Sequence, residues 1–170
     1  MSWKEHKAKA PKSVKFAVLT ISSTRDFERD KSGKLIEESL EKAGHQLIKR
    51  IIVKDKLEDI KNGVKSLLLI DAEVIITTGG TGISTKDLTL EAIKPLLSKE
   101  IQGFGELFRH LSYEEIGSPA ILSRALGGVT NLEGKRKILI ALPGSPNACK
   151  LACEKLIIPE LSHLVWEANR

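Results

Sequence analysis

The sequence is poor in the residues that mark several common kinds of protein and site. Cysteine occurs twice in 170 residues, at Cys149 and Cys153, which is too few for a disulfide framework. Their spacing places both thiols on one face of a helix, and no histidine stands close to them in sequence. We therefore interpret the pair as packing residues rather than as zinc ligands.

Aromatic residues and long apolar runs are scarce as well. Aromatic side chains make up 4% of the chain, so there are few platforms on which nucleic-acid bases can stack. No apolar run approaches the roughly 20 residues that a membrane-spanning helix needs. The N-terminal residues also lack the apolar core of a signal peptide. We therefore expect a cytoplasmic protein with no membrane partner.

Charged residues are plentiful, but they are not gathered into one basic surface. The formal net charge is +5, yet lysines recur beside glutamates along helical patterns such as Glu37 to Lys42. We therefore expect no nucleic-acid partner, and tight, salt-sensitive binding to a duplex would contradict this expectation. We interpret the positive excess as an attraction for an anionic substrate.

Length and composition are those of one globular domain preceded by a short arm. The chain is 41% hydrophobic and 29% charged, and its length suffices for a sizeable core. Residues 1–13 are basic, contain Pro11 and show no periodicity, so we expect a flexible N-terminal arm. We expect residues 14–170 to form a single domain, because no linker or internal repeat divides them.

Short apolar segments alternate with segments of helical periodicity along this domain. The predicted strands are residues 14–21, 46–53, 73–77 and 137–142. The first predicted helix has Leu35, Ile36, Leu40 and Ala43 on one face and stops at Gly44. The others are residues 56–69, the segment from about Thr89 through Leu97, and residues 148–163, the last interrupted near Pro159. Such alternation is typical of an α/β sandwich with a largely parallel sheet.

Between these elements, residues 103–128 show a weaker pattern. Ser112 followed by Glu115 matches a capping box, which predicts that a helix begins at Ser112. Residues 122–128 end in Gly127-Gly128, and we predict that they are irregular or form a short strand.

The most informative segment joins the predicted strand at 73–77 to the next helix. It contains a glycine turn made of Thr78, Gly79, Gly80, Thr81 and Gly82, with Asp87 downstream. Glycines let the backbone approach a ligand closely, and turn amides at the start of a helix can bind an anion. The segment matches neither a Walker loop nor the dinucleotide pattern, so a purely steric reason for its glycines stays open. Together with Asp87, the turn points to a phosphate-rich substrate and a divalent cation.

Several other predicted strands end in polar or glycine-rich loops. In parallel sheets, ligands bind at the carboxyl ends of the strands, so we expect loops 22–30, 79–87 and 143–147 to meet at one edge. Asp55 follows the strand at 46–53 and reaches the same edge. Asp87 and Asp55 are candidate Mg²⁺ ligands, because this ion prefers carboxylates and substrate phosphates. Helix capping by Asp87 and an ordinary turn position for Asp55 remain open alternatives.

Further candidates for the site each have a structural alternative. They are Glu106, Ser123, Arg124, Pro143, Gly144 and Ser145. Ser145 either binds a phosphate or opens the last helix, and Arg124 either binds an anion with Ser123 or pairs with a surface carboxylate. Glu106 orients substrate, contacts another subunit or is merely solvated. Such groups suffice for phosphoryl or nucleotidyl transfer, which needs positioning and charge neutralisation more than a protein nucleophile.

Together, these motifs resemble the MoaB/Mog family of molybdenum cofactor biosynthesis proteins. The resemblance rests on Asp30–Gly33, Thr78–Gly82 with Asp87 and Thr89, Gly103–Arg109, Ser123–Ala125 and Leu142–Pro146. Their order and spacing are jointly specific, and the resemblance extends from about Val14 to about Leu161. Residues 105–117 are closer to the MoaB branch than to the Mog branch.

The resemblance implies a three-layer α/β/α sandwich and a homo-oligomer, either a trimer or a hexamer. It also implies adenylylation of molybdopterin with Mg-ATP and release of pyrophosphate. Gly79 to Gly82 then hold phosphates, and the loop from Pro143 to Pro146 completes the anion pocket. Asp87 and Asp55 handle Mg²⁺ and the reacting phosphates. The nucleophile is the terminal phosphate of molybdopterin, so no serine or cysteine nucleophile is expected.

One position departs from the family pattern, and other functions stay open. Ser23 stands where many relatives carry an aspartate after the first strand, which puts a catalytic role for this loop in doubt. The main alternative is a non-catalytic molybdopterin-binding or carrier protein of the same pathway, since catalysis is less securely assigned to MoaB-type members. Molybdate-inserting relatives use the same domain within longer chains, so the length of this chain argues against that function.

Overall fold

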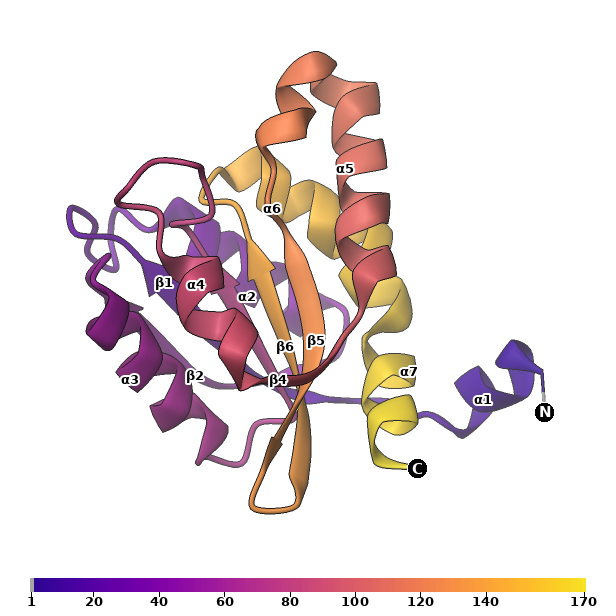
Figure 1. The fold of residues 1–170 in the computed structure, drawn as a ribbon. Coiled ribbons are helices and arrows are strands. Elements are labelled where there is room, and N and C mark those ends of the chain that lie inside the picture. Colours follow the sequence, from indigo (N-terminus) through magenta and orange to yellow (C-terminus); the bar gives the residue numbers. More distant parts are fainter. Residues whose placement is uncertain (1) are drawn as a thin grey trace.

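The computed structural model describes residues 2–170, which form a six-stranded sheet with helices on both faces (Figure 1). The strands are β1 (Lys15–Ile21), β2 (Gln46–Val53), β3 (Val74–Thr78), β4 (Leu97–Glu100), β5 (Leu126–Leu132) and β6 (Lys135–Leu142). The α-helices are α1 (Trp3–Lys9), α2 (Lys31–Lys42), α3 (Leu57–Leu68), α4 (Thr89–Ile93), α5 (Gln102–Ile116), α6 (Pro146–Ala152) and α7 (Ile158–Asn169). Two 3-10 segments, η1 (Lys94–Leu96) and η2 (Ser118–Leu122), follow α4 and α5, and a π-helical turn, η3 (Cys153–Ile157), joins α6 to α7. Within the described residues, none of these helices has the length and apolar character needed to cross a membrane.

The sheet is mostly parallel, as predicted. Its strand order is β2-β1-β3-β6-β5-β4, in which the first four strands run parallel and β5 runs antiparallel to both of its neighbours. Thr78 of β3 pairs with Thr20 of β1 on one side and with Leu142 of β6 on the other. These three central strands therefore end level, and the loops that follow them begin at the same edge of the sheet.

Both faces of the sheet are buried, which explains why the inner parts of its central strands are largely apolar. In β1, Phe16 and Val18 pack in one core, whereas Ala17 and Leu19 pack in the other. The first core also contains buried residues of α2, α5, α6 and α7, and the second contains those of α3 and α4. The expected three-layer α/β/α sandwich is therefore confirmed (Figure 1).

Residues 122–128, which the sequence left open, contribute to a 3-10 segment and a full strand. Gly127 and Gly128 lie inside β5, in spite of the low strand preference of glycine. A Cβ atom on Gly128 would lie 2.6 Å from Leu97 Cδ1 and 2.7 Å from the Lys99 carbonyl oxygen. Gly128 thus allows the backbone of β4 to pack closely against β5, a requirement that depends on residues about thirty positions away.

The predicted helix start at Ser112 is wrong. α5 begins ten residues earlier, at Gln102, and Ser112 is a buried residue within it. Gly103 and Gly105 weaken the local helix preference, so the sequence pattern does not predict that the helix begins there. Burial of Phe104 and Phe108, one turn apart on the core-facing side, holds the first turns in place.

The N-terminal arm contains a helix where the sequence pattern predicts no regular structure. Ser2 and Glu5 form a capping box at the start of α1, with the Ser2 amide donating to Glu5 Oε2 at 2.5 Å. α1 contacts α7 and lies outside the main sandwich (Figure 1). The flexibility expected of residues 1–13 stays a prediction.

Cys149 and Cys153 lie in the core that contains α6 and α7. Burial raises the pKa of the Cys149 thiol to about 11 and that of the Cys153 thiol to about 12. At neutral pH both are therefore protonated, which agrees with their interpretation as packing residues. The Cys149 thiol also donates to the Pro143 carbonyl at 3.3 Å.

Candidate functional site

The glycine turn follows β3 directly, at the edge where β1 and β6 also end. Gly79 and Gly80 have φ angles of +98° and +65°, a backbone region that favours glycine. A Cβ atom on Gly79 would lie 2.4 Å from the Ile21 carbonyl oxygen, and one on Gly80 would lie 2.4 Å from Thr89 Oγ1. The fold itself therefore requires both glycines, so their presence alone does not indicate a ligand.

Thr89 fixes the shape of this turn. Its hydroxyl donates to the Gly79 carbonyl at 2.7 Å, and its amide donates to the Gly80 carbonyl at 3.0 Å. The Gly79 amide donates to the Leu142 carbonyl at 3.1 Å. Among the described residues, the amides of Gly80 and Thr81 have no protein acceptor. The turn therefore holds two amide donors that the described protein groups do not use.

The loop after β6 packs against the glycine turn, as expected for neighbouring parallel strands. Thr78 is buried, and its hydroxyl donates to the Pro143 carbonyl at 2.9 Å. The Gly144 carbonyl accepts hydrogen bonds from the Ser32 hydroxyl at 2.8 Å and from Arg25 Nη1 at 3.3 Å. The predicted meeting of loops 22–30, 79–87 and 143–147 therefore occurs in the structure. Ser145 occupies the N-cap of α6, where its hydroxyl accepts the Ala148 amide at 3.2 Å.

Asp87 folds back over the end of the glycine turn as a half-buried carboxylate. Its Oδ2 atom accepts the Ser84 hydroxyl at 2.7 Å and the Ser84 amide at 3.0 Å. The Ser84 hydroxyl lowers the pKa of Asp87 most; the amides of Ser84 and Gly82 and the charge of Arg124 add to this effect, against a smaller opposing effect of burial. Asp87 is therefore ionised at neutral pH and held beside the turn, as a cation ligand must be.

Asp55 lies at the end of β2 and forms a hydrogen bond with the Ser23 hydroxyl. The Asp55 amide also donates to Ser23 Oγ at 3.3 Å, so the loop after β1 and the end of β2 are joined. Asp55 and Asp87 share no hydrogen-bond partner among the described residues: Asp55 bonds Ser23, whereas Asp87 bonds Ser84. The structure thus places both carboxylates after strands of the same edge and anchors each to its own serine.

Arg124 donates hydrogen bonds to backbone carbonyls of the glycine turn and of the loop after it. Its Nε atom donates to the Thr81 carbonyl at 2.9 Å, and Nη2 donates to the Asp87 carbonyl at 3.3 Å. The guanidinium also pairs with Glu91, at 2.7 Å between Nη1 and Oε1. Arg124 therefore pairs with a surface carboxylate, which was one of its two predicted roles. The other role, binding of an anion by Arg124, stays a prediction.

Glu106, Ser123 and Arg124 line one cavity of about 400 Å³ beside α5. This volume is within the range of small-molecule sites. Charges of both signs line the cavity: the cations are Lys94, Arg109 and Arg124, and the carboxylates are Glu100 and Glu106. Lys94 pairs with Glu100 at 3.4 Å. Because Arg124 also contacts Thr81 and the Asp87 backbone, it connects the cavity to the glycine turn. The predicted site residues thus form two neighbouring groups joined by Arg124.

The sequence pattern predicts no role for Asp30, but in the structure this residue joins the start of α2 to the end of β1. Asp30 is 1% exposed and is the N-cap of α2, where its Oδ1 atom accepts the Gly33 amide at 2.9 Å. Its Oδ2 atom accepts the hydroxyl of Thr20, the penultimate residue of β1, at 2.7 Å. The available signal was an aspartate just before a helical pattern, which is a common N-cap.

Replacing Asp30 with alanine is expected to lower the free energy of unfolding by about 2–4 kcal/mol. About 1 kcal/mol of this is the lost N-cap, and the remainder is the cost of leaving the buried Thr20 hydroxyl without an acceptor. Urea denaturation of wild type and variant measures the change. Glu38→Ala is the control, since Glu38 is an exposed residue of the same helix and should change stability by less than about 0.5 kcal/mol. Equal effects of the two substitutions would contradict a structural role of Asp30.

Comparison with known proteins adds independent observations. A family model described as "Probable molybdopterin binding domain" matches residues 17–163. The chain is 50% identical to Molybdenum cofactor biosynthesis protein B of Bacillus cereus, and the match covers 100% of this chain and 99% of that protein. A crystal structure of a Molybdenum cofactor biosynthesis protein B has a TM-score of 0.89 at 49% identity, covering 95% of this chain and 99% of the other. The tungsten cofactor synthesizing protein MoaB from Pyrococcus furiosus has a TM-score of 0.86 at 39% identity, with coverages of 95% and 100%.

Proposed function

This chain belongs to the molybdopterin-binding domain family, and from that membership we propose that it adenylylates molybdopterin with Mg-ATP. The pathway, molybdenum cofactor biosynthesis, is the one that its relatives are named for. The observation that carries the proposal is the turn after β3, in which the amides of Gly80 and Thr81 have no protein acceptor among the described residues and the ionised Asp87 lies against Gly82. Amide donors and a carboxylate at one turn suit a phosphate chain bound together with a cation.

The proposed reaction requires no nucleophile from the protein. An oxygen of the terminal phosphate of molybdopterin attacks the α-phosphorus of ATP. The bond from that phosphorus to the oxygen that bridges the α- and β-phosphates breaks. Pyrophosphate leaves, and adenylyl-molybdopterin remains. The protein must then position two anionic substrates and neutralise their charge. The thiols of Cys149 and Cys153 are buried and protonated, which is consistent with a reaction in which the substrate supplies the nucleophile.

The residues present suit Mg²⁺. Asp87 and Asp55 offer hard oxygen donors at the carboxyl edge of the sheet, and each is fixed by a serine. We assign Asp87 to hold the ion that accompanies ATP, with Asp55 in a supporting position. When bound, Mg²⁺ would offset negative charge on the phosphates and on the departing pyrophosphate.

The cavity lined by Glu106, Ser123 and Arg124 extends this site. We propose that it receives the part of the substrate that the glycine turn does not hold. Arg109, which forms no ion pair in the described part of the chain, would attract the negative charge of that part. The loop from Pro143 to Ser145 closes the other side of the turn, since its Gly144 packs against Gly79. Together, these groups would hold both substrates at the same edge.

A non-catalytic molybdopterin-binding or carrier protein is the second candidate. The turn amides and the cavity beside α5 suffice for binding, so this alternative uses the same geometry without turnover. Pyrophosphate release separates the two candidates: an enzyme releases pyrophosphate only when molybdopterin, ATP and Mg²⁺ are all present. Binding of molybdopterin without pyrophosphate release would favour the carrier.

We also propose that the protein is a cytoplasmic homo-oligomer, a trimer or a hexamer. Large apolar side chains on α5 and η2 are exposed, among them Tyr113 at 62% and Ile121 at 83%, and such exposure favours a protein interface. Sedimentation velocity of the purified protein should therefore give three or six times the mass of the 18.7 kDa chain. A monomer at micromolar concentration would contradict the proposal.

A further inference from the structure

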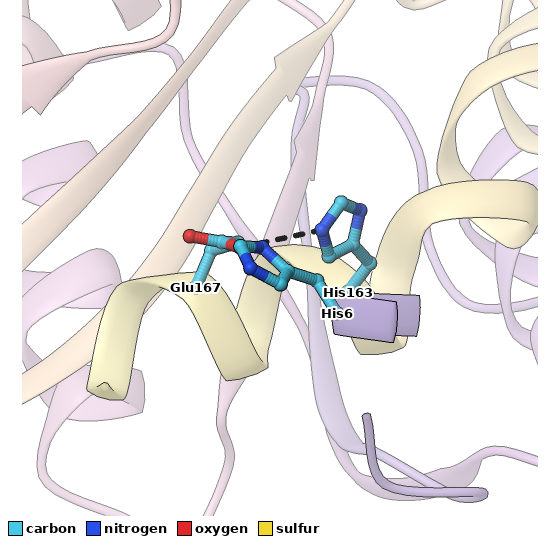
Figure 2. Close-up of side chains that lie close together, drawn as sticks. All are labelled: His6, His163 and Glu167. Atoms are coloured by element: carbon cyan, nitrogen blue, oxygen red, sulfur yellow. Dashed lines mark hydrogen bonds and ion pairs between the residues drawn. The ribbon is translucent and has the colours of Figure 1, made fainter. Parts of the chain in front are cut away.

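One group of at least three potential metal ligands occurs among residues 2–170, and it lies outside the site described above. It consists of His6 of α1 with His163 and Glu167 of α7, whose ligand atoms lie within 4.8 Å of one another (Figure 2). We propose that this cluster binds a divalent first-row metal ion such as Zn²⁺, and that the ion clips the N-terminal helix onto the C-terminal one.

The position of the cluster follows from the packing of the two terminal helices. His163 and Glu167 are four residues apart in α7, so both project from one face of this helix. α1 contacts α7 and places His6 against that face. In Figure 1, this contact is remote from the loop between β3 and α4, so the cluster is separate from the proposed Mg²⁺ position.

His163 has the surroundings of a metal-bound histidine. Its Nδ1 atom forms a hydrogen bond with Glu160 Oε2 at 2.9 Å, which fixes the ring. Its other nitrogen, Nε2, is buried and makes no hydrogen bond among the described residues, and its carboxylate neighbour is Glu167 Oε1 at 3.4 Å. Histidine ligands of metals commonly bond a carboxylate through one nitrogen and the metal through the other. The buried Nε2 atom is therefore free of hydrogen bonds and lies beside a carboxylate oxygen, an arrangement that suits a metal ligand.

The spacing of the ligand atoms is close to that of a metal site. His163 Nε2 and Glu167 Oε1 are 3.4 Å apart. Two ligands at the usual 2.0–2.2 Å from Zn²⁺ are separated by about 3.3–3.6 Å in tetrahedral geometry. His6 Nδ1 lies 2.5 Å from Glu167 Oε1, as a hydrogen bond, and must move outward by about 1 Å to admit the ion. Because His6 lies on the terminal arm, this movement leaves the core undisturbed.

Neighbouring ion pairs hold two carboxylates in position, that of Glu167 in the cluster and that of Glu160 beside it. Lys7 pairs with Glu160, the residue that orients His163. Arg170 donates from Nε to Glu167 Oε2 at 2.6 Å, which leaves Oε1 turned toward the two histidines. Two imidazoles and one carboxylate, with water as a fourth ligand, form a donor set that favours Zn²⁺ or its neighbours over Mg²⁺.

A fluorescence titration tests binding, because both tryptophans of the chain lie at this junction. Trp3 is in α1 and Trp166 is in α7, with the Trp166 ring centroid 4.9 Å from that of His6. Tag-free protein treated with a chelator should show a saturable change with Zn²⁺ at one ion per chain. Mg²⁺ should neither produce this change nor compete. A wild-type protein that binds no Zn²⁺ at micromolar concentration would overturn the proposal.

Matched variants assign the binding to these residues. His163→Gln and His6→Gln should each weaken Zn²⁺ binding by about 100-fold or more, since loss of even an outer-sphere partner costs 10–100-fold. His6→Gln is the safer variant for folding, because His6 lies in α1, outside the main sandwich (Figure 1). His110→Gln is the control: His110 is an exposed residue of α5 that approaches Glu114 at 3.4 Å with the same four-residue spacing. Equal binding by His163→Gln and His110→Gln would also overturn the proposal.

Limited proteolysis tests the clip itself. Trypsin cuts after the lysines of residues 4–12, and Zn²⁺ should slow this cleavage in the wild type because it holds α1 on α7. Cleavage of His163→Gln should be insensitive to Zn²⁺. Stoichiometric Zn²⁺ binding without slower cleavage of the wild type would overturn the role as a clip.

Discussion

Substituting Asp87 with asparagine is expected to reduce adenylyl transfer by about 100-fold or more while leaving the fold intact. The charge that would hold Mg²⁺ and oppose the charge on the phosphates is lost, and losses of this size follow removal of one such group. The asparagine carbonyl oxygen can still accept the Ser84 amide and hydroxyl that now bond Asp87 Oδ2. The measurement is the steady-state rate of pyrophosphate release with both substrates and Mg²⁺, alongside the thermal unfolding midpoint.

Asp71→Asn serves as the matched control for this substitution. Asp71 precedes β3, at the opposite end from the glycine turn, and pairs with Lys15 at the surface. Its replacement should leave the rate within about twofold, because long-range surface charges are screened at physiological ionic strength. If Asp87→Asn retained the wild-type rate, Asp87 would not be the metal ligand, whatever the activity of the control.

Replacing Gly79 with alanine is expected to lower the free energy of unfolding by about 2–5 kcal/mol. A positive φ costs a residue with a Cβ atom about 1–2 kcal/mol, and crowding in a packed region adds about 1–3 kcal/mol. The crowding is specific, since the new Cβ atom would lie 2.4 Å from the Ile21 carbonyl oxygen, a backbone atom of β1. Urea denaturation measures the change.

Gly103→Ala tests whether this loss belongs to the turn rather than to glycine replacement in general. Gly103 lies in α5, and a Cβ atom there would have no neighbour within 4 Å. Its substitution should raise the free energy of unfolding by about 0.5–1 kcal/mol, because alanine favours a helix more than glycine does. A Gly79→Ala protein as stable as wild type would mean that the turn adopts another backbone conformation.

The main architecture could be predicted because the strong signals in the sequence are local. β1, β2, β3 and β6 are short apolar runs, and β2 has the bounds that the pattern predicts. α2 and α3 each carry a regular apolar face, and Gly44 ends the first of these segments with a φ of +94°. Alternation of such runs leaves few arrangements other than a largely parallel sheet.

The errors fall where long-range packing overrides local preference. α5 begins among glycines because Phe104 and Phe108 bury against the sheet, and the serine mistaken for its N-cap is buried within it. β5 contains two adjacent glycines because Gly128 faces Leu97 and the backbone of β4. Neither requirement can be read from the residues on either side.

For the site, the sequence predicts which loops meet but not which atoms bond. Register of β1, β3 and β6 brings the three loops together, as topology requires. The bonds from Arg124 to Thr81 and to the Asp87 carbonyl join segments about forty residues apart, so no local pattern reveals them. The contact between His6 and Glu167 spans 161 residues and depends on how the two termini pack.

Transfer of label from ATP to molybdopterin measures the proposed chemistry most directly. With ATP labelled at the α-phosphate, Mg²⁺ and molybdopterin, adenylyl transfer predicts that the label appears in the pterin product in equal amount to the pyrophosphate released. Label at the γ-phosphate should instead appear only in pyrophosphate. If molybdopterin binds at the site and the α-label stays in ATP, the protein is a binding or carrier protein and not an adenylyltransferase.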